Sequence, residues 1–341
     1  MALTTRALER RQVLAGAAGL GLLALAGGRP AMAAEIGKLH FLIPGGPGGG
    51  PGGGPGGSWD GTARGVGEAL TKAGLVNTAS YQNMSGAGGG KAIAHLIETA
   101  ARQHRTLMVN STPIIIRSLQ KVFPQSFRDL TPIAAVIADY GAFVVRPDSP
   151  LQTWQDLLEA FRANPRTLRV AGGSLRGGMD HLVAALAFQA AGEDPLALRY
   201  VPYDAGGKAL AGLLAGETEV LSTGLGAVLS QLRKGQLRIL AITADQRTIE
   251  LPEVPTLTEL GTEAVFADWR GFFAAPGLPS EKADLYAAVL GRMYETPDWE
   301  IIRERNGWTN LYKAREDFTA FLEGQEQVVA ALMHQLGVLA D

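Results

Sequence analysis

Glycine and small polar residues follow several apolar segments, and their types and spacing could do chemistry. Each of these junctions precedes a segment with helical periodicity. A helix start leaves N–H groups without internal partners and carries partial positive charge, so a tight Gly/Ser turn before it can bind an anion. Gly and Ser also cap helices and turn the chain, so any single junction has a purely structural interpretation. Their repetition favours a shared anion site. The junctions are Asn110-Ser111-Thr112, Gly172-Gly173-Ser174, residues 204–207 and Ser222-Thr223-Gly224.

Covalent catalysis is poorly supported by the same residues. A nucleophile elbow at Ser174 needs Gly two positions later, where Arg176 stands. Asp180 and His181 are adjacent, so on a helix they point in different directions. The five His show no metal-ligand spacing, and the glycine patterns fail as nucleotide-binding loops. We expect no catalytic residue, metal or cofactor, and an exported α/β hydrolase using Ser174 or Ser111 is the alternative.

Composition excludes several classes of function. The 341 residues contain 31 Lys+Arg, 33 Asp+Glu and no Cys, with a formal charge of −2. This near-neutral charge gives no positive electrostatic field that would attract nucleic acid. The lack of Cys excludes disulfides, thiol nucleophiles and Cys-based metal sites. Length and a 46% hydrophobic content fit a soluble globular protein of about two domains.

The first 33 residues have the pattern of a signal peptide. Arg10 and Arg11 precede an apolar run at residues 13–26, and Ala31-Met32-Ala33 supplies small residues for cleavage. The paired arginines resemble a twin-arginine export signal. The apolar run is shorter than the roughly 18–20 residues that span a bilayer. We expect a mature protein in the periplasm.

Strand-length apolar runs alternate with helical patterns along the mature chain, which predicts a parallel α/β architecture. Residues 140–146 and 237–242 differ, because neither leads into a helix through a Gly/Ser turn. We interpret them as lying near crossings between two lobes. The predicted lobes are 34–141 with 265–341, and 142–264, with a ligand cleft between them.

Seven short motifs, taken in order and spacing, resemble the extracytoplasmic solute receptors of tripartite tricarboxylate transporters, the Bug receptor family. The resemblance covers roughly residues 36–339. The motifs lie at residues 41–44 (Phe-Leu-Ile-Pro), 59–60 (Trp-Asp), 83–89, 110–111, 201–203, 237–243 and 251–256 (Leu-Pro-Glu-Val-Pro-Thr).

That resemblance implies a two-lobe periplasmic binding protein of the type II-like, Venus-flytrap kind. It would close on a carboxylate, with citrate or a related di- or tricarboxylate as first guess, and present it to the membrane subunits of a transporter. We expect a monomer; a receptor feeding a signalling partner is a further alternative. The ligand-binding residues carried over by position are Ser58, Trp59, Asp60, Asn110, Ser111, Gly172, Gly173, Ser174, Tyr203, Gly206, Gly207, Ser222 and Thr223.

Two features near the first motif differ from what a simple carboxylate site would have. Residues 45–57 are ten Gly and three Pro, longer than the loop that the family usually has there, and we expect the extra residues to bulge into solvent. Asp60 is an awkward neighbour for an anion. It could cap the helix, hold a bridging water, or face an ammonium group if the ligand is an amino acid.

Overall fold

The computed structural model describes residues 36–47, 59–249, 251–306 and 308–339. The predicted signal peptide, Ser58 and most of the Gly/Pro tract lie outside the described residues. Within those ranges, no helix combines the length and apolar character needed to cross a membrane.

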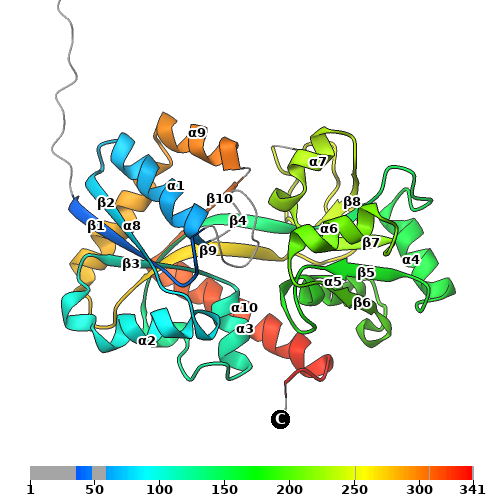
Figure 1. The fold of residues 1–341 in the computed structure, drawn as a ribbon, viewed down its shortest axis with the longest axis horizontal. Coiled ribbons are helices and arrows are strands. Elements are labelled where there is room, and N and C mark those ends of the chain that lie inside the picture. The colour runs from blue at the N-terminus through cyan, green and yellow to red at the C-terminus, as the bar shows by residue number, and fades with distance from the viewer. Residues whose placement is uncertain (1–35, 48–58, 250, 307, 340–341) are drawn as a thin grey trace, which may run out of the picture. The chain divides into compact units, whose positions relative to one another are not determined.

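Ten strands alternate with helices along this part of the chain (Figure 1). The strands are β1 (Ile36–Ile43), β2 (Val76–Asn83), β3 (Thr106–Ser111), β4 (Thr131–Val145), β5 (Arg169–Gly172), β6 (Arg199–Pro202), β7 (Val220–Gly224), β8 (Arg238–Ile242), β9 (Ala267–Ala274) and β10 (Thr309–Ala314).

The α-helices occupy the intervals between most of these strands. They are α1 (Trp59–Lys72), α2 (Gly90–Glu98), α3 (Pro113–Leu119), α4 (Trp154–Ala163), α5 (Met179–Ala190), α6 (Gly206–Leu214), α7 (Leu229–Arg233), α8 (Ser280–Met293), α9 (Pro297–Asn306) and α10 (Arg315–Gln335). Short 3₁₀ turns lie at Ala87–Gly89, Ala100–Arg102, Phe127–Asp129, Pro195–Ala197, Leu225–Ala227 and Thr258–Leu260.

The long strand β4 belongs to two groups of strands. Its residues 131–140 pair with β9 and β10, in a sheet that continues through β3 and β1 to β2. Its residues 141–145 pair with β7 and β8, in a sheet that continues through β5 to β6. Figure 1 shows β4 and β9 running side by side between the two sets of elements. The two-lobe α/β prediction is confirmed.

Strand direction differs from the all-parallel prediction. The outer strands β1, β2 and β3, and likewise β5, β6 and β7, pair in parallel as βαβ units do. Strands β4 and β9 run antiparallel to their partners, because each carries the chain from one lobe to the other. Segment 237–242 becomes β8, which pairs with β4 inside the second sheet. The chain then returns along β9.

Helices cover both faces of each sheet, which explains the buried apolar runs of the strands. In the first lobe, α1, α8 and α9 pack on one face and α2, α3 and α10 on the other. In the second lobe, α6 and α7 contribute to one core, and α4 and α5 to the other. Both faces of each sheet therefore carry a hydrophobic core, and the core of α2, α3 and α10 also includes Leu182, Val183 and Ala185 of α5.

Trp154 is the central side chain of the α4–α5 core. Its ring centroid lies 4.8 Å from that of Phe143 and 5.7 Å from that of Phe188, and its Nε1 donates to Thr262 Oγ1 at 3.0 Å. The side chain is 1% exposed. It thus holds α4 against β4 and the neighbouring helix.

Replacing Trp154 with alanine should destabilise the second lobe by about 3–5 kcal/mol, because it leaves a large cavity and an unpaired Thr262 hydroxyl. Urea unfolding measures the loss. Trp154→Phe retains most of the ring contacts and should cost clearly less. Equal unfolding midpoints for wild type and Trp154→Ala would contradict this role.

Candidate functional site

A cavity of about 1400 Å³ lies where the two lobes and the strands that join them meet. The first lobe contributes Pro44, the start of α1, the loop before α2, helix α3 and the end of α9. The second lobe contributes the loops after β5, β6 and β7. The side chains that carry charge in its lining are Arg117, Asp139, Arg176, Asp180, Asp204, Arg233, Lys234, Asp268, Arg270, Glu304 and Arg305.

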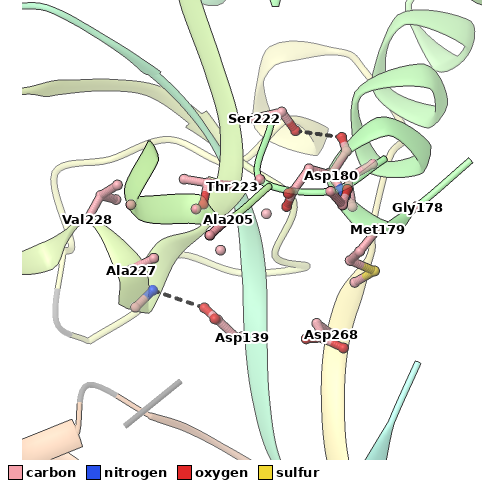
Figure 2. Close-up of a pocket in the computed structure, with 18 of the residues that line it drawn as sticks. Asp139, Gly178, Met179, Asp180, Ala205, Ser222, Thr223, Ala227, Val228 and Asp268 are labelled. Atoms are coloured by element: carbon pink, nitrogen blue, oxygen red, sulfur yellow. Dashed lines mark hydrogen bonds between the residues drawn. The ribbon is translucent and has the colours of Figure 1, made fainter. Parts of the chain in front are cut away.

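The joining strands supply the floor of this cavity, which we define as Asp139, Asp268 and Arg270. Asp139 on β4 pairs in register with Asp268 on β9. Arg270 follows two positions along β9, so period-2 alternation puts it on the same face as Asp268. Its Nη2 lies 3.7 Å from Asp139 Oδ2 and 3.8 Å from Asp268 Oδ2. Figure 2 shows both aspartates beside the cavity.

Burial raises the pKa of both floor carboxyls. For Asp139, the charge of Arg270 and backbone N–H groups of Gly226 and Leu225 oppose the effect of burial. Gly226 N donates to Asp139 Oδ1 at 3.0 Å. For Asp268, burial raises the pKa to about 6, with Arg270 opposing and Asp139 reinforcing the shift. The shifts show that burial disfavours the charged form of both carboxyls and that Arg270 offsets this effect only in part.

A third carboxyl, Asp180, begins α5 above the floor (Figure 2). Its backbone N–H donates to Ser174 Oγ at 3.0 Å, and its carbonyl accepts from Ser222 Oγ at 2.9 Å. Burial raises the pKa of Asp180 to about 7, and the charges of Asp268 and Asp139 add to the shift. The three acids thus act on one another electrostatically.

The hydroxyl of Ser174 is engaged with structural partners. Besides the N–H of Asp180, it lies 3.2 Å from Tyr200 Oη, which itself donates to the Ser174 carbonyl at 2.7 Å. His181 accepts from the N–H of Gly177 at its Nδ1, and burial lowers its pKa to about 4. These contacts are those of a rigid loop, and they give no support to a serine nucleophile with a histidine base.

Gly173 allows two loops of the second lobe to touch. A Cβ at this position would stand 2.2 Å from Gly206 N and 2.4 Å from Gly206 Cα. Both contacts are with backbone, which cannot rotate away. The close approach brings the loop after β5 and the start of α6 together in the cavity wall.

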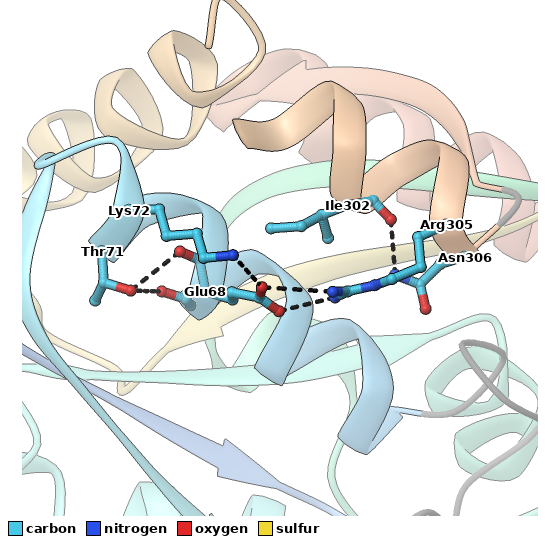
Figure 3. Close-up of polar contacts among 7 residues, drawn as sticks. Glu68, Thr71, Lys72, Ile302, Arg305 and Asn306 are labelled. Atoms are coloured by element: carbon cyan, nitrogen blue, oxygen red, sulfur yellow. Dashed lines mark hydrogen bonds and ion pairs between the residues drawn. The ribbon is translucent and has the colours of Figure 1, made fainter. Parts of the chain in front are cut away.

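The first-lobe rim near α9 is held by ion pairs (Figure 3). Arg305 donates to Glu68 Oε2 at 2.8 Å, and Lys72 donates to Glu68 Oε1 at 2.8 Å. The hydrogen bond from Arg305 is the largest cause that lowers the pKa of Glu68 to about 2. On the opposite side of the rim, Arg117 donates to the Gly88 carbonyl. The rim is therefore basic where the floor is acidic.

The residues predicted from sequence divide into two sets. Those that line the cavity are Trp59, Gly173, Ser174, Tyr203, Gly206, Gly207, Ser222 and Thr223. Those that do not are Asp60, Asn110, Ser111 and Gly172, whereas Ser58 lies outside the described residues.

The predicted residues that do not line the cavity lie directly behind it. Asp60 accepts from Arg64 Nε and Asn83 Nδ2, both at 3.0 Å, on α1 and β2. Ser111 Oγ accepts from the indole Nε1 of Trp59 at 3.0 Å, and Ser111 is paired in register with Arg270. Ser111 therefore supports Trp59, which faces the cavity, whereas Asp60 connects α1 to the end of β2.

The floor residues were missed by sequence reasoning. Asp268 and Arg270 alternate with apolar residues in β9, and Asp139 interrupts the long apolar run of β4. Charged residues inside fully buried strands are uncommon unless they are paired. Charged residues within apolar strands were therefore a signal of a polar site in the sequence. The sequence did not indicate that β4 and β9 would be neighbours, so it could not bring these three residues together.

Gly173→Ala should separate the loop after β5 from the start of α6, at a cost of about 1–3 kcal/mol in unfolding free energy, because the added methyl meets backbone. Thermal unfolding measures it. Gly207→Ala is the matched control, since its Cβ has no neighbour within 4 Å, and it should be neutral or slightly stabilising. Equal effects of the two substitutions would contradict the close approach.

Asp180→Asn should change how stability depends on pH. Because the pKa of Asp180 is about 7 in the folded protein and roughly 3.9 in unfolded chains, the folded state binds more protons in this interval. Unfolding free energy therefore falls as pH rises from about 4 to 7, by at most about 4 kcal/mol and less where cavity water screens the charge. The variant should lack this fall and be the more stable protein at pH 8.

The control for that measurement is Asp204→Asn. Asp204 also lines the cavity, but it is exposed and its pKa is lowered by the hydrogen bond from Lys208. It should leave the fall between pH 4 and 7 intact. Superimposable pH profiles for wild type and Asp180→Asn would refute the assignment.

Comparison with known sequences identifies the family. Residues 62–338 match the family described as the tripartite tricarboxylate transporter family receptor. A protein encoded in the tcbD–tcbE intergenic region of Pseudomonas sp. (strain P51) is 29% identical over 62% of this chain and 62% of its own length. Protein BugT of Bordetella pertussis is 32% identical over 58% of this chain and 60% of its own. The chain thus spans about three fifths of these two relatives.

Solved structures share the fold over nearly the whole described chain. A TctC solute-binding protein from Polaromonas has a TM-score of 0.74 at 23% identity, covering 88% of this chain and 98% of that one. A Rhodopseudomonas palustris protein with adipate has a TM-score of 0.71 at 21% identity, covering 88% of this chain and 97% of its own. MatC from the same species, with bound malate, has a TM-score of 0.64 at 20% identity, covering 88% of this chain and 99% of its own.

The family match extends over most of the chain, and the two-lobe fold with its cavity agrees with these structures. The chain belongs to the tripartite tricarboxylate transporter receptor family.

Proposed function

We propose that this protein is a periplasmic receptor that captures a carboxylate in the cavity by closing its lobes, and delivers it to the membrane subunits of a tripartite tricarboxylate transporter. In this proposal it acts as a monomer, without cofactor and without catalysis. The observation that carries the proposal is one large cavity lined by both lobes and by the strands that join them.

The size of the cavity supports closure. Small-molecule sites usually have volumes of about 300–1000 Å³, and this one has about 1400 Å³. A ligand that contacts both lobes gains contacts when the volume shrinks, and this differential binding shifts an open–closed equilibrium. Strands β4 and β9 pass between the lobes, so a small change in their twist suffices as a hinge.

The lining also supports an anionic group on the ligand. Helices α5 and α6 begin at the cavity, so the loops before them bring backbone N–H groups to its wall. Strand β7 contributes Ser222 and Thr223 to the same lining. The basic rim attracts an anion from solution. Malate and adipate, held by two structures of the same fold, are carboxylates of suitable size.

A thermal-shift screen tests the receptor assignment. The panel contains citrate, malate, adipate, succinate, glutarate, aromatic acids and amino acids with an acidic side chain. A ligand at a hundredfold excess over its dissociation constant stabilises the folded state by about 2.7 kcal/mol, equivalent to roughly 5 °C or more in a chain of this size. We expect at least one carboxylate to give this shift.

The control is the Gly173→Ala variant, in which the cavity wall is displaced and the shift should shrink. Absence of any shift over the whole panel, together with no carboxylate released from freshly purified protein in mass spectrometry, would overturn the proposed function.

A further inference from the structure

The floor of the cavity contains donors and acceptors whose hydrogen-bonding capacity the protein does not satisfy. Arg270 Nε and Nη2 and Asp268 Oδ1 have no hydrogen-bond partner among the described residues. Their side chains are nevertheless well buried, with Arg270 1% and Asp268 8% exposed. An unsatisfied buried polar group costs about 1–3 kcal/mol. A ligand that pairs with these atoms would recover that cost.

The unsatisfied groups are of opposite kinds and lie beside each other. Arg270 offers N–H donors with positive charge, and Asp268 offers an acceptor with negative charge, across 3.8 Å between Nη2 and Oδ2. This separation is too long for a direct hydrogen bond, so these atoms of Arg270 and Asp268 do not satisfy each other. Asp139 Oδ2 stands at a similar 3.7 Å from the same nitrogen. A ligand group with adjacent positive and negative charges is complementary to this arrangement.

The charges of the side chains around the cavity also favour a ligand with a positive group. Asp139, Asp180 and Asp268 line the same part of the cavity (Figure 2), and Arg270 Nη2 lies within 4 Å of Asp139 and Asp268. A plain polycarboxylate would bring more negative charge to three acids. An ammonium group would supply the missing positive charge where burial makes each ion pair stronger. The exposed basic side chains of Arg233 and Lys234 in the cavity lining are placed for a distal carboxylate.

A metal ion is a poorer occupant. Among the described residues, no group of three or more His, Asp or Glu side chains is arranged to hold a metal. An Arg at the centre of the acids would also repel it. A compact organic cation next to a carboxylate avoids both difficulties.

We propose that Asp139, Asp268 and Arg270 bind the ammonium and carboxylate groups of an amino acid, so that the ligand is an aminocarboxylate and not a plain di- or tricarboxylate. This inference rests on the proposed receptor function and specifies its ligand. The ammonium donates to Asp268 and Asp139, the neighbouring carboxylate accepts from Arg270, and the rest of the ligand extends toward the basic rim.

Matched ligand pairs that differ by one amino group test the proposal by isothermal titration calorimetry on the wild-type protein. The pairs are L-aspartate with succinate, L-glutamate with glutarate, and L-2-aminoadipate with adipate. We expect at least one amino member to bind at least tenfold more tightly than its partner. Equal or tighter binding of the plain acid in every pair that binds would overturn this inference while leaving the receptor function intact. Binding by neither member of any pair would also overturn this inference, and it would count against the receptor function only if the whole carboxylate panel gave no shift either.

Asp268→Asn tests the residue assignment. It should weaken the preferred amino member at least thirtyfold and change the plain acid less than threefold, because the amide keeps the shape but loses the charge. Asp148→Asn, at an exposed position outside the cavity lining, is the matched control and should change neither. Unaltered preference in Asp268→Asn would refute the assignment.

Folding of the variant is checked by its unfolding midpoint. We expect Asp268→Asn to be at least as stable as wild type when empty, since it removes a like charge opposite Asp139. Should it fail to fold, Asp139→Asn provides the second variant and should abolish the same preference. A folded Asp139→Asn protein that still prefers the amino member would overturn the proposal.

Discussion

The antiparallel pairing of β4 with β9 is the interaction on which the rest of the structure depends. These two strands pass between the lobes, and their register places Asp139 opposite Asp268. Like charges directly opposite one another destabilise a sheet, and here Arg270 and the N–H of Gly226 offset part of that repulsion. The backbone ladder therefore holds charges together that would separate in a flexible loop.

Stability and ligand binding make opposite demands on this region. A well-packed apolar floor would make the empty protein more stable, because buried carboxyls and unsatisfied guanidinium donors both cost free energy. The four apolar cores on the outer faces of the sheets supply stability instead. One of these cores also includes Leu182, Val183 and Ala185 of α5 together with residues of α10, so these two helices pack against each other.

Family membership and ligand choice rest on different parts of the chain. The fold persists among proteins that are 20–23% identical, because buried apolar positions and turns maintain it. Ligand choice depends on a few side chains at the cavity, which can change without altering the cores. In the proposed receptor, the floor of Asp139, Asp268 and Arg270 is such a group, and it belongs to the strands that also join the lobes.

The sequence by itself determined the family, the two-lobe α/β class and the Gly/Ser junctions before helices, since these depend on local patterns and motif order. Eight of the predicted site residues line the cavity, and they lie at strand ends or helix starts that can be recognised locally. The supporting places of Asp60 and Ser111, and the whole charged floor, were decided by tertiary structure. Pairing between β4 and β9 joins residues far apart in the chain, and no local pattern reveals which buried strand will lie beside another.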